Sequence, residues 1–311
     1  MIGVRPPSAP PPVSRVRFRR WRRMVAGGVL FGGAVVAGWA APAGATWSVA
    51  ATDADTGEVG VAVASCVPVE TVGDPAALLP PAVVVPGLAA GVVQGQIDLA
   101  PVAEMTELIN AGLDPRTVVD RLVIADGELA AVRQYAVVDL AGTSVGVTGD
   151  EVLPESGWRS APGASAQANL TASPEVVGDT IDGFVVARAE GADLAGALVA
   201  GLAAGSRAGG DRRCPASTAL FAHVAVAGAT DAPGRPSFVT TVSVDEGDTV
   251  NPVEELVAAV AAGRTGAIDA AQHRDRGGGW VTAVALGFSL AAVTGGLWIF
   301  RRGLGARQAR R

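Results

Sequence analysis

The chain has 311 residues, enough for one large domain or two small ones, and with 49% apolar but only 5% aromatic residues its core must be built from Ala, Val, Leu and Gly. All 24 basic residues are arginine, of which seven lie before residue 24 and five after residue 300. The middle part of the chain holds the other 12 arginines and all 30 acidic residues, so its net charge is −18. Phosphates would repel so acidic a domain, which argues against a nucleic-acid partner.

The first 45 residues are predicted to be a basic leader and an export signal. A proline-rich start is followed by the basic stretch "RVRFRRWRRM" and by an apolar, uncharged segment over residues 25–40. Ala43 and Ala45 then supply small residues at the two positions that a signal peptidase reads. We expect cleavage between Ala45 and Thr46; an uncleaved signal anchor is the alternative.

A β-hairpin is expected directly after this cut. Residues 46–53 and 58–65 both alternate with a period of two, and the turn residues Asp55, Thr56 and Gly57 lie between them. One face of the hairpin carries larger side chains and the other very small ones. Both faces are apolar enough to be buried, so we expect this sheet to lie between two layers.

The remaining elements favour an α+β domain rather than alternating βαβ units. Asp114 followed by Pro115 is typical of a helix start, and so is Asn251 followed by Pro252. The order of strands, a helix pair, strands, a helix pair, strands and a helix fits two sheets with paired helices outside them. The expected strands are 83–85, 91–94, 133–139, 144–148, the end of "SAQANL", 218–227 and 238–244, and the expected helices are 99–111, 114–125, 173–189, 193–207 and 251–262.

The C-terminal part is predicted to anchor the chain in a membrane. Residues 280–300 carry no charge and would span roughly 31 Å as a helix, about the thickness of a bilayer core. Arginines at 301–311 follow at once, which places the C-terminus in the cytoplasm. The alternative is a hydrophobic core helix. We therefore expect five parts: signal (1–45), extracytoplasmic domain (46–265), stalk (266–279), transmembrane helix (280–300) and cytoplasmic tail (301–311).

Several motifs together resemble a bacterial domain-of-unknown-function family, number ten twenty-eight. They are "TWSVAATDADTGEVGVAVASC", "AVRQYAVVD", "AQANL" before "SPEVV", "GGDRRCPASTAL" and "NPVEEL", in that order over residues 46–262. The opening hairpin and "GGDRR" are the most specific of them. The resemblance implies the four-layer αββα sandwich of N-terminal-nucleophile hydrolases. It implies no particular substrate.

That resemblance assigns a role to Thr46. Hydrolases of this type use the side chain of the first residue of the mature chain as nucleophile and its α-amine as base, because the amine has a pKa of about 8. Signal cleavage after Ala45 would give Thr46 a free amine at the start of a strand. The alternative is that Thr46 is only a favourable residue after a cleavage site.

Other residues are candidates for a supporting role at such a site. In "GGDRR", Asp211 could orient the Thr46 amine and Arg212 could hold a carboxylate in bidentate fashion, although a solvated loop with an internal ion pair is equally consistent. Ser65 is expected to be a neighbour from the adjacent strand. Gln96 and Asn169, like Gln94, lie near strand ends and could line a pocket or donate to an oxyanion. The absence of lysine is a departure, because several such hydrolases lower the pKa of the amine with one.

The cysteines and histidines favour a disulfide over a metal site. Two His and two Cys do not make a convincing set of ligands, and His223 within an apolar strand is expected to be structural. Outside the cell, a pair of cysteines more often forms a disulfide than remains as two thiols, so we expect a bond between Cys66 and Cys214. If both motifs line one cleft, as the resemblance implies, the bond would hold the "GGDRR" loop beside the strand. We expect no cofactor.

Two functions remain open from the sequence. The first is a membrane-anchored extracytoplasmic amidohydrolase that acts on a small amide or peptide through Thr46. The second is a non-catalytic ectodomain that binds a small ligand or a protein partner in the same cleft. The mature N-terminus distinguishes them, because a chain that begins elsewhere cannot use this mechanism.

Overall fold

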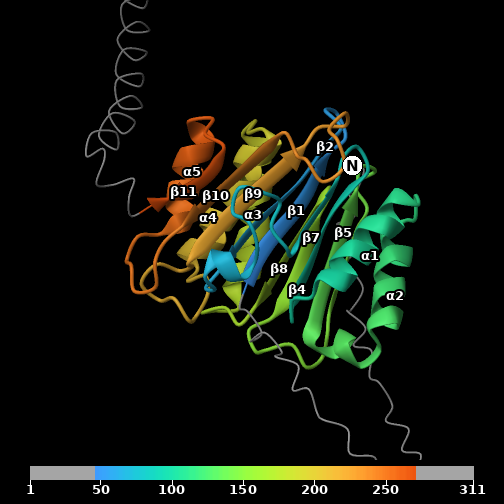
Figure 1. Cartoon of the computed structure of the whole chain (residues 1–311), viewed down its shortest axis with the longest axis horizontal. Helices are drawn as coiled ribbons and strands as arrows, with labels where there is room; N and C mark the ends of the chain where they lie inside the picture. Colours follow the sequence, from blue (N-terminus) through green and yellow to red (C-terminus); the bar gives the residue numbers. More distant parts are fainter. Residues whose placement is uncertain (1–45, 271–311) are drawn as a thin grey trace, which may run out of the picture. The chain divides into compact units, whose positions relative to one another are not determined.

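The computed structural model describes residues 46–270, which form five α-helices, eleven strands and two short 3-10 helices (Figure 1). The strands are β1 (Thr46–Asp53), β2 (Glu58–Ser65), β3 (Ala82–Val85), β4 (Ala89–Gly95), β5 (Arg133–Asp139), β6 (Ser144–Thr148), β7 (Gly157–Ala161), β8 (Ala164–Asn169), β9 (Phe221–Ala227), β10 (Phe238–Ser243) and β11 (Gly266–Asp269). The helices are α1 (Leu99–Asn110), α2 (Pro115–Asp126), α3 (Glu175–Ala189), α4 (Leu194–Arg207) and α5 (Pro252–Ala261), with 3-10 helices at Val69–Thr71 and Gly127–Val132.

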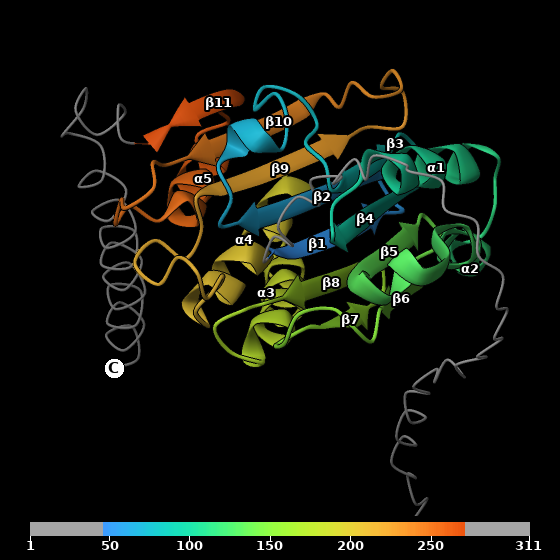
Figure 2. The ribbon, with the colours of Figure 1, turned by 60° about the horizontal axis from the view of Figure 1, so that its bottom comes forward.

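The strands form two sheets. The larger has the order β11-β10-β9-β2-β1-β8-β7, and the smaller has the order β3-β4-β5-β6 (Figure 2). All neighbouring pairs are antiparallel except β10 and β11. In the opening hairpin Thr46 pairs with Ser65 and Asp53 with Glu58, which is the hairpin that the alternation predicted.

Three apolar clusters lie on the faces of these sheets. Trp47, Val49 and Ala51 on one face of β1 pack with buried residues of α3, α4 and α5. Ala50, on the opposite face of β1, belongs to a cluster that includes residues of β3, β4 and β5. The other face of the smaller sheet packs with α1 and α2, where Met105 is buried. Each sheet is therefore covered on both faces.

Side chains at the helix starts explain why four of the five described helices begin where they do. Asp98, Asp114, Asp193 and Asn251 each precede a helix and accept a hydrogen bond from a backbone N–H of its first turn. Such a cap satisfies a donor that has no partner within the helix. The starts predicted at Asp114 and Asn251 are thus confirmed.

The structure confirms a mixed α+β domain and differs from the prediction at three places. The strand expected over 218–227 begins only at Phe221. Strand β7 was not predicted. Strand β11 pairs in parallel with β10, so the fold extends beyond the expected domain end at residue 265 into the segment interpreted as a stalk. Within residues 46–270 no helix is long and apolar enough to cross a membrane; the predicted signal (1–45) and transmembrane segment (280–300) lie outside the described residues.

A buried arginine ties α1 and α2 to the smaller sheet. The Arg133 side chain, 2% exposed, forms ion pairs with Asp126 at the end of α2 (2.5 Å) and with Asp98 at the start of α1 (2.9 Å). Its Nε donates to the backbone carbonyl of Gln96 at 3.1 Å. The Tyr135 hydroxyl donates to the second oxygen of Asp126, and burial, together with this contact, raises the pKa of Tyr135.

His223 on β9 is also buried, without any exposed surface. Its Nδ1 lies 2.8 Å from the hydroxyl of Thr241 on β10. Burial lowers the pKa of His223 from 6.5 to about 3, so the ring is neutral in the folded protein at neutral pH. These contacts agree with the structural role expected from the sequence.

Acid is therefore expected to destabilise the protein through His223. The unfolded chain takes up this proton near pH 6.5 and the folded chain only near pH 3, so stability is complete above pH 6.5 and is lost as the pH falls. The free energy of unfolding should decrease by about 1.4 kcal/mol per pH unit in this window, or about 2–3 kcal/mol at pH 4.5. Urea unfolding of the wild type and of a His223→Leu/Thr241→Val double variant, which removes both partners, measures this. Identical pH profiles for the two proteins would contradict the prediction.

Candidate functional site

Thr46 lies at the start of β1, an interior strand of the larger sheet. Its neighbours across the sheet are Ser65 on β2 and Asn169 on β8. Because Trp47 points toward the helices, where its Nε1 donates to the carbonyl of Leu202, Thr46 is on the face toward the smaller sheet. Thr46 is 1% exposed, and its hydroxyl donates to the Ser65 hydroxyl at 3.3 Å.

Uncharged amides from both sheets surround this strand end. Gln94 on β4 donates to the carbonyl of Thr46 at 3.4 Å and accepts from the Ser48 hydroxyl at 2.7 Å. Gln134 on β5 accepts from both Gln94 and Asn169, each at 3.0 Å. These side chains are all buried, so they form a polar patch in an otherwise apolar space between the sheets.

The "GGDRR" loop brings a carboxylate to the same strand end. Asp211 is completely buried, and its carboxylate accepts from the backbone N–H of Cys66, the residue after Ser65, at 2.8 Å. The loop can turn this tightly because Gly210 has a φ of 58°, and a Cβ there would come within 2.9 Å of Trp47. The glycines of the motif are therefore needed to place Asp211.

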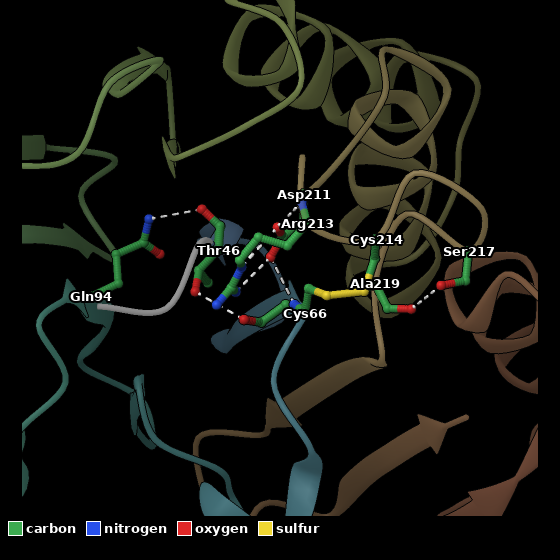
Figure 3. Close-up of polar contacts among 9 residues, drawn as sticks. Thr46, Cys66, Gln94, Asp211, Arg213, Cys214, Ser217 and Ala219 are labelled. Atoms are coloured by element: carbon green, nitrogen blue, oxygen red, sulfur yellow. Dashed lines mark hydrogen bonds and ion pairs between the residues drawn. A yellow bond between two sulfur atoms is a disulfide. The ribbon is translucent and has the colours of Figure 1, made fainter. Parts of the chain in front are cut away.

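Arg213 neutralises this carboxylate. Its guanidinium lies 2.8 Å from one oxygen of Asp211, and its backbone N–H and Nε donate to the other. In Figure 3 the Arg213 side chain extends from the loop toward Thr46. The Arg213 side chain is 29% exposed whereas Asp211 is fully buried, so the ion pair connects the interior to the surface.

The predicted disulfide is confirmed. Cys66 and Cys214 are bonded, with their Cα atoms 5.9 Å apart, although 148 positions separate them in the sequence (Figure 3). Together with the hydrogen bond from Cys66 to Asp211, the disulfide holds the loop against the end of β2. The loop therefore cannot leave the Thr46 end of the sheet without breaking a covalent bond.

The structure brings together four of the predicted residues: Thr46, Ser65, Asn169 and Asp211. Arg212 is exposed, and its backbone N–H donates to the carbonyl of Leu170 at 3.4 Å. The internal ion pair of the loop is formed by Arg213 with Asp211.

Gln96 lies outside the polar patch. It follows the end of β4 and is partly exposed, and its backbone contacts Val132 and Arg133. The amide that reaches Thr46 is that of Gln94, two residues earlier. Sequence reasoning also missed Gln134 as part of the site, although it lies within the quoted motif "AVRQYAVVD".

The described residues include no group of three or more His, Cys, Asp or Glu side chains placed to hold a metal ion. What the site offers chemically is a set of hydroxyls, neutral amides and one ion pair. Such groups can position and polarise an uncharged substrate group, and Thr46 is the nucleophile candidate among them.

Comparisons with known proteins agree with the motifs. The model of a family described as of unknown function, DUF1028, matches residues 46–256, a range that begins at Thr46. A crystal structure of a DUF1028 protein from Silicibacter pomeroyi is similar, with a TM-score of 0.54 and 23% identity over 71% of this chain and 87% of that one. At this identity the similarity shows a shared fold. A search of curated proteins finds no match. The family match covers more than half of the chain and confirms the resemblance, so the chain belongs to the DUF1028 family of unknown function.

Proposed function

We propose that this protein is an extracytoplasmic amidohydrolase that uses Thr46 as its N-terminal nucleophile once the signal has been removed. The observation that carries the proposal is the position of Thr46. It is the first residue of an interior strand, its hydroxyl bonds to Ser65, and polar side chains from four other strands and one loop surround it. A threonine that only followed a cleavage site would not need such surroundings.

The proposed fold is the four-layer αββα sandwich of N-terminal-nucleophile hydrolases. The three apolar clusters support it, because each joins two adjacent layers. In the proposed order, α3 to α5 cover the larger sheet, the two sheets face each other, and α1 and α2 cover the smaller sheet.

In the proposed reaction the Thr46 hydroxyl attacks the carbonyl carbon of an amide. The hydroxyl proton passes to the α-amine of Thr46, whose pKa of about 8 suits a base near neutral pH. The amine then protonates the leaving nitrogen as the C–N bond breaks, which leaves an ester on Thr46. Water cleaves that ester, and the products are a carboxylic acid, an amine and the free threonine.

The neighbouring side chains have roles in this scheme. Asn169 uses one amide hydrogen toward Gln134, and its second can donate to the oxyanion that forms on the substrate. Ser65 accepts from the Thr46 hydroxyl and orients it. Asp211 and Arg213 place opposite charges beside the strand end, where the Arg213 guanidinium favours the neutral form of a nearby amine.

The mature N-terminus tests this proposal. We expect the membrane-bound protein to begin at Thr46 with an unblocked amine, as read by N-terminal sequencing or by mass spectrometry of the N-terminal peptide. A native chain that begins at any other residue would exclude the mechanism. The second function, a non-catalytic ectodomain that binds a ligand or partner, would then be favoured.

We also propose that residues 46–270 face outward and that a helix over 280–300 holds them at the cell membrane. The disulfide supports export, because such bonds persist in oxidising compartments. Protease added to intact cells should remove the acidic domain and leave a C-terminal tag protected. Digestion of the tag from outside would reverse the topology.

A further inference from the structure

Three polar side chains between the two sheets lack partners. Ser165 and Gln167 on β8 face the smaller sheet, because the even-numbered alanines of that strand pack toward the helices. Both are 1% exposed. Among the described residues, neither the Ser165 hydroxyl nor either polar atom of the Gln167 amide has a hydrogen-bond partner, and the same holds for the buried hydroxyl of Ser144 on β6. We call Ser144, Ser165 and Gln167 the unpaired polar cluster.

A neighbouring amide shows how unusual this is. Gln134 is as deeply buried as Gln167, yet its oxygen accepts from two side chains, and its nitrogen has three acceptors within 3.1 Å for its two hydrogens: the Thr148 hydroxyl and the carbonyls of Gly157 and Ala168. Buried amides are nearly always satisfied, because desolvation without a hydrogen bond is costly. Gln167 therefore needs a partner that this part of the chain does not supply.

The residues opposite the cluster are small. Ala136 on β5 and Gly146 on β6 are a cross-strand pair. The residues that flank them along each strand pack against α1 and α2, so Ala136 and Gly146 face the larger sheet. Trp158 on β7, the cross-strand neighbour of Gln167, packs on Gly146, where a Cβ would come within 2.9 Å of the indole. The indole of Trp158 thus lies between the sheets against Gly146, on the strand next to Gln167.

We propose that the unpaired polar cluster is a binding site for ordered water between the two sheets. Water is small enough to lie beside the Trp158 indole opposite Ala136, and it both donates and accepts, as the amide and the two hydroxyls require. The cluster contains no charged side chain, so its ligand is neutral. Gln167 is the cross-strand neighbour of Ser48 on β1, and Asn169, two residues further along β8, is the neighbour of Thr46. The water therefore lies next to the polar patch around Thr46. This site does not depend on the chemistry of Thr46.

Thermal unfolding of the full-length protein tests the site, because the two possibilities predict opposite signs. If water pairs the amide, Gln167→Met removes hydrogen bonds and should lower the Tm by about 3–6 °C. Ser165→Ala should also lower it, and the double variant should lose less than the sum, because both residues share the water. The control is Ser160→Ala on β7, which is directly opposite Ser165 but exposed, and should leave the Tm unchanged.

Two results would overturn the proposal. A higher Tm for Gln167→Met would mean that the amide is unpaired in a dry interior, where an apolar replacement is stabilising. A high-resolution crystal structure of the wild type settles the matter even if the variants do not fold. It should show water within about 3.2 Å of the Gln167 amide, and the absence of density there would exclude the site.

Discussion

Replacement of Thr46 by alanine is expected to leave the domain folded and exported and to lower amide hydrolysis by at least about 10³-fold, the scale on which loss of a catalytic nucleophile acts. The change removes one hydroxyl at the start of a strand, together with its hydrogen bond to Ser65. Thr46→Ser keeps both the hydroxyl and the amine and should retain part of the activity. The measurement is release of amine from a panel of chromogenic amides.

A labelling experiment covers the case in which the panel contains no substrate. A β-lactone acylates an activated threonine hydroxyl, and intact mass spectrometry detects the adduct without a known substrate. The matched control is a protein with one extra residue before Thr46, which keeps the hydroxyl but blocks the amine, and should be neither active nor labelled. Equal activity in the alanine variant, or equal labelling of the extended protein, would end the catalytic hypothesis.

Arg133→Met is expected to destabilise the domain strongly, because it removes a buried guanidinium that makes two ion pairs. The substitution leaves the mostly buried carboxylate of Asp126 without its counter-charge, and loss of one partner from a buried ion pair costs about 3–5 kcal/mol. The anchor of α1 at Asp98 and the contact with the Gln96 carbonyl are lost as well. Urea unfolding followed by circular dichroism gives the free energy directly.

The control for Arg133 is its more exposed partner. Asp98 has 46% of its side chain exposed, so Asp98→Asn should cost only about 1 kcal/mol or less. Combining Arg133→Met with Asp126→Leu should recover part of the loss, because no charge then remains buried. If Arg133→Met cost no more than Asp98→Asn, the interpretation of the cluster as a stabilising anchor would be wrong.

Local patterns were enough to predict the part of the site that lies on regular strands. Alternation over 46–53 and 58–65 places Thr46 opposite Ser65 without further information, and the two strands have that register. The disulfide followed from the expected compartment. Asp211 was found because it lies in "GGDRR", one of the two most specific motifs of the family resemblance.

Other residues could not be chosen from the sequence because their roles depend on where an element ends or how a loop turns. Gln94 and Gln96 are two residues apart, so on a continuous strand they would lie on the same face. Because β4 ends at Gly95, where φ is 90°, only Gln94 lies between the sheets. Arg212 and Arg213 are adjacent, and only the conformation of the loop decides which one meets Asp211.

Contacts between the sheets were the least predictable. Gln134 on β5 belongs to the site because it contacts Ala168 and Asn169 on β8, a strand of the other sheet. No spacing of residues along the chain predicts such a contact between sheets. Strand β7 was missed because it is an edge strand with Arg159 and Ser160 exposed, so it lacks the apolar alternation of a buried strand.

The bond between Cys66 and Cys214 also decides how the protein behaves when it is cut. It closes a covalent ring that contains the whole smaller sheet, α1 to α4, the edge strand β7 and its neighbour β8. A single proteolytic nick anywhere in this ring leaves two fragments that still migrate together on a gel without thiol and separate only after reduction. A nick outside the ring releases its fragment at once, so comparing the two gels maps a cleavage to one side of the bond or the other.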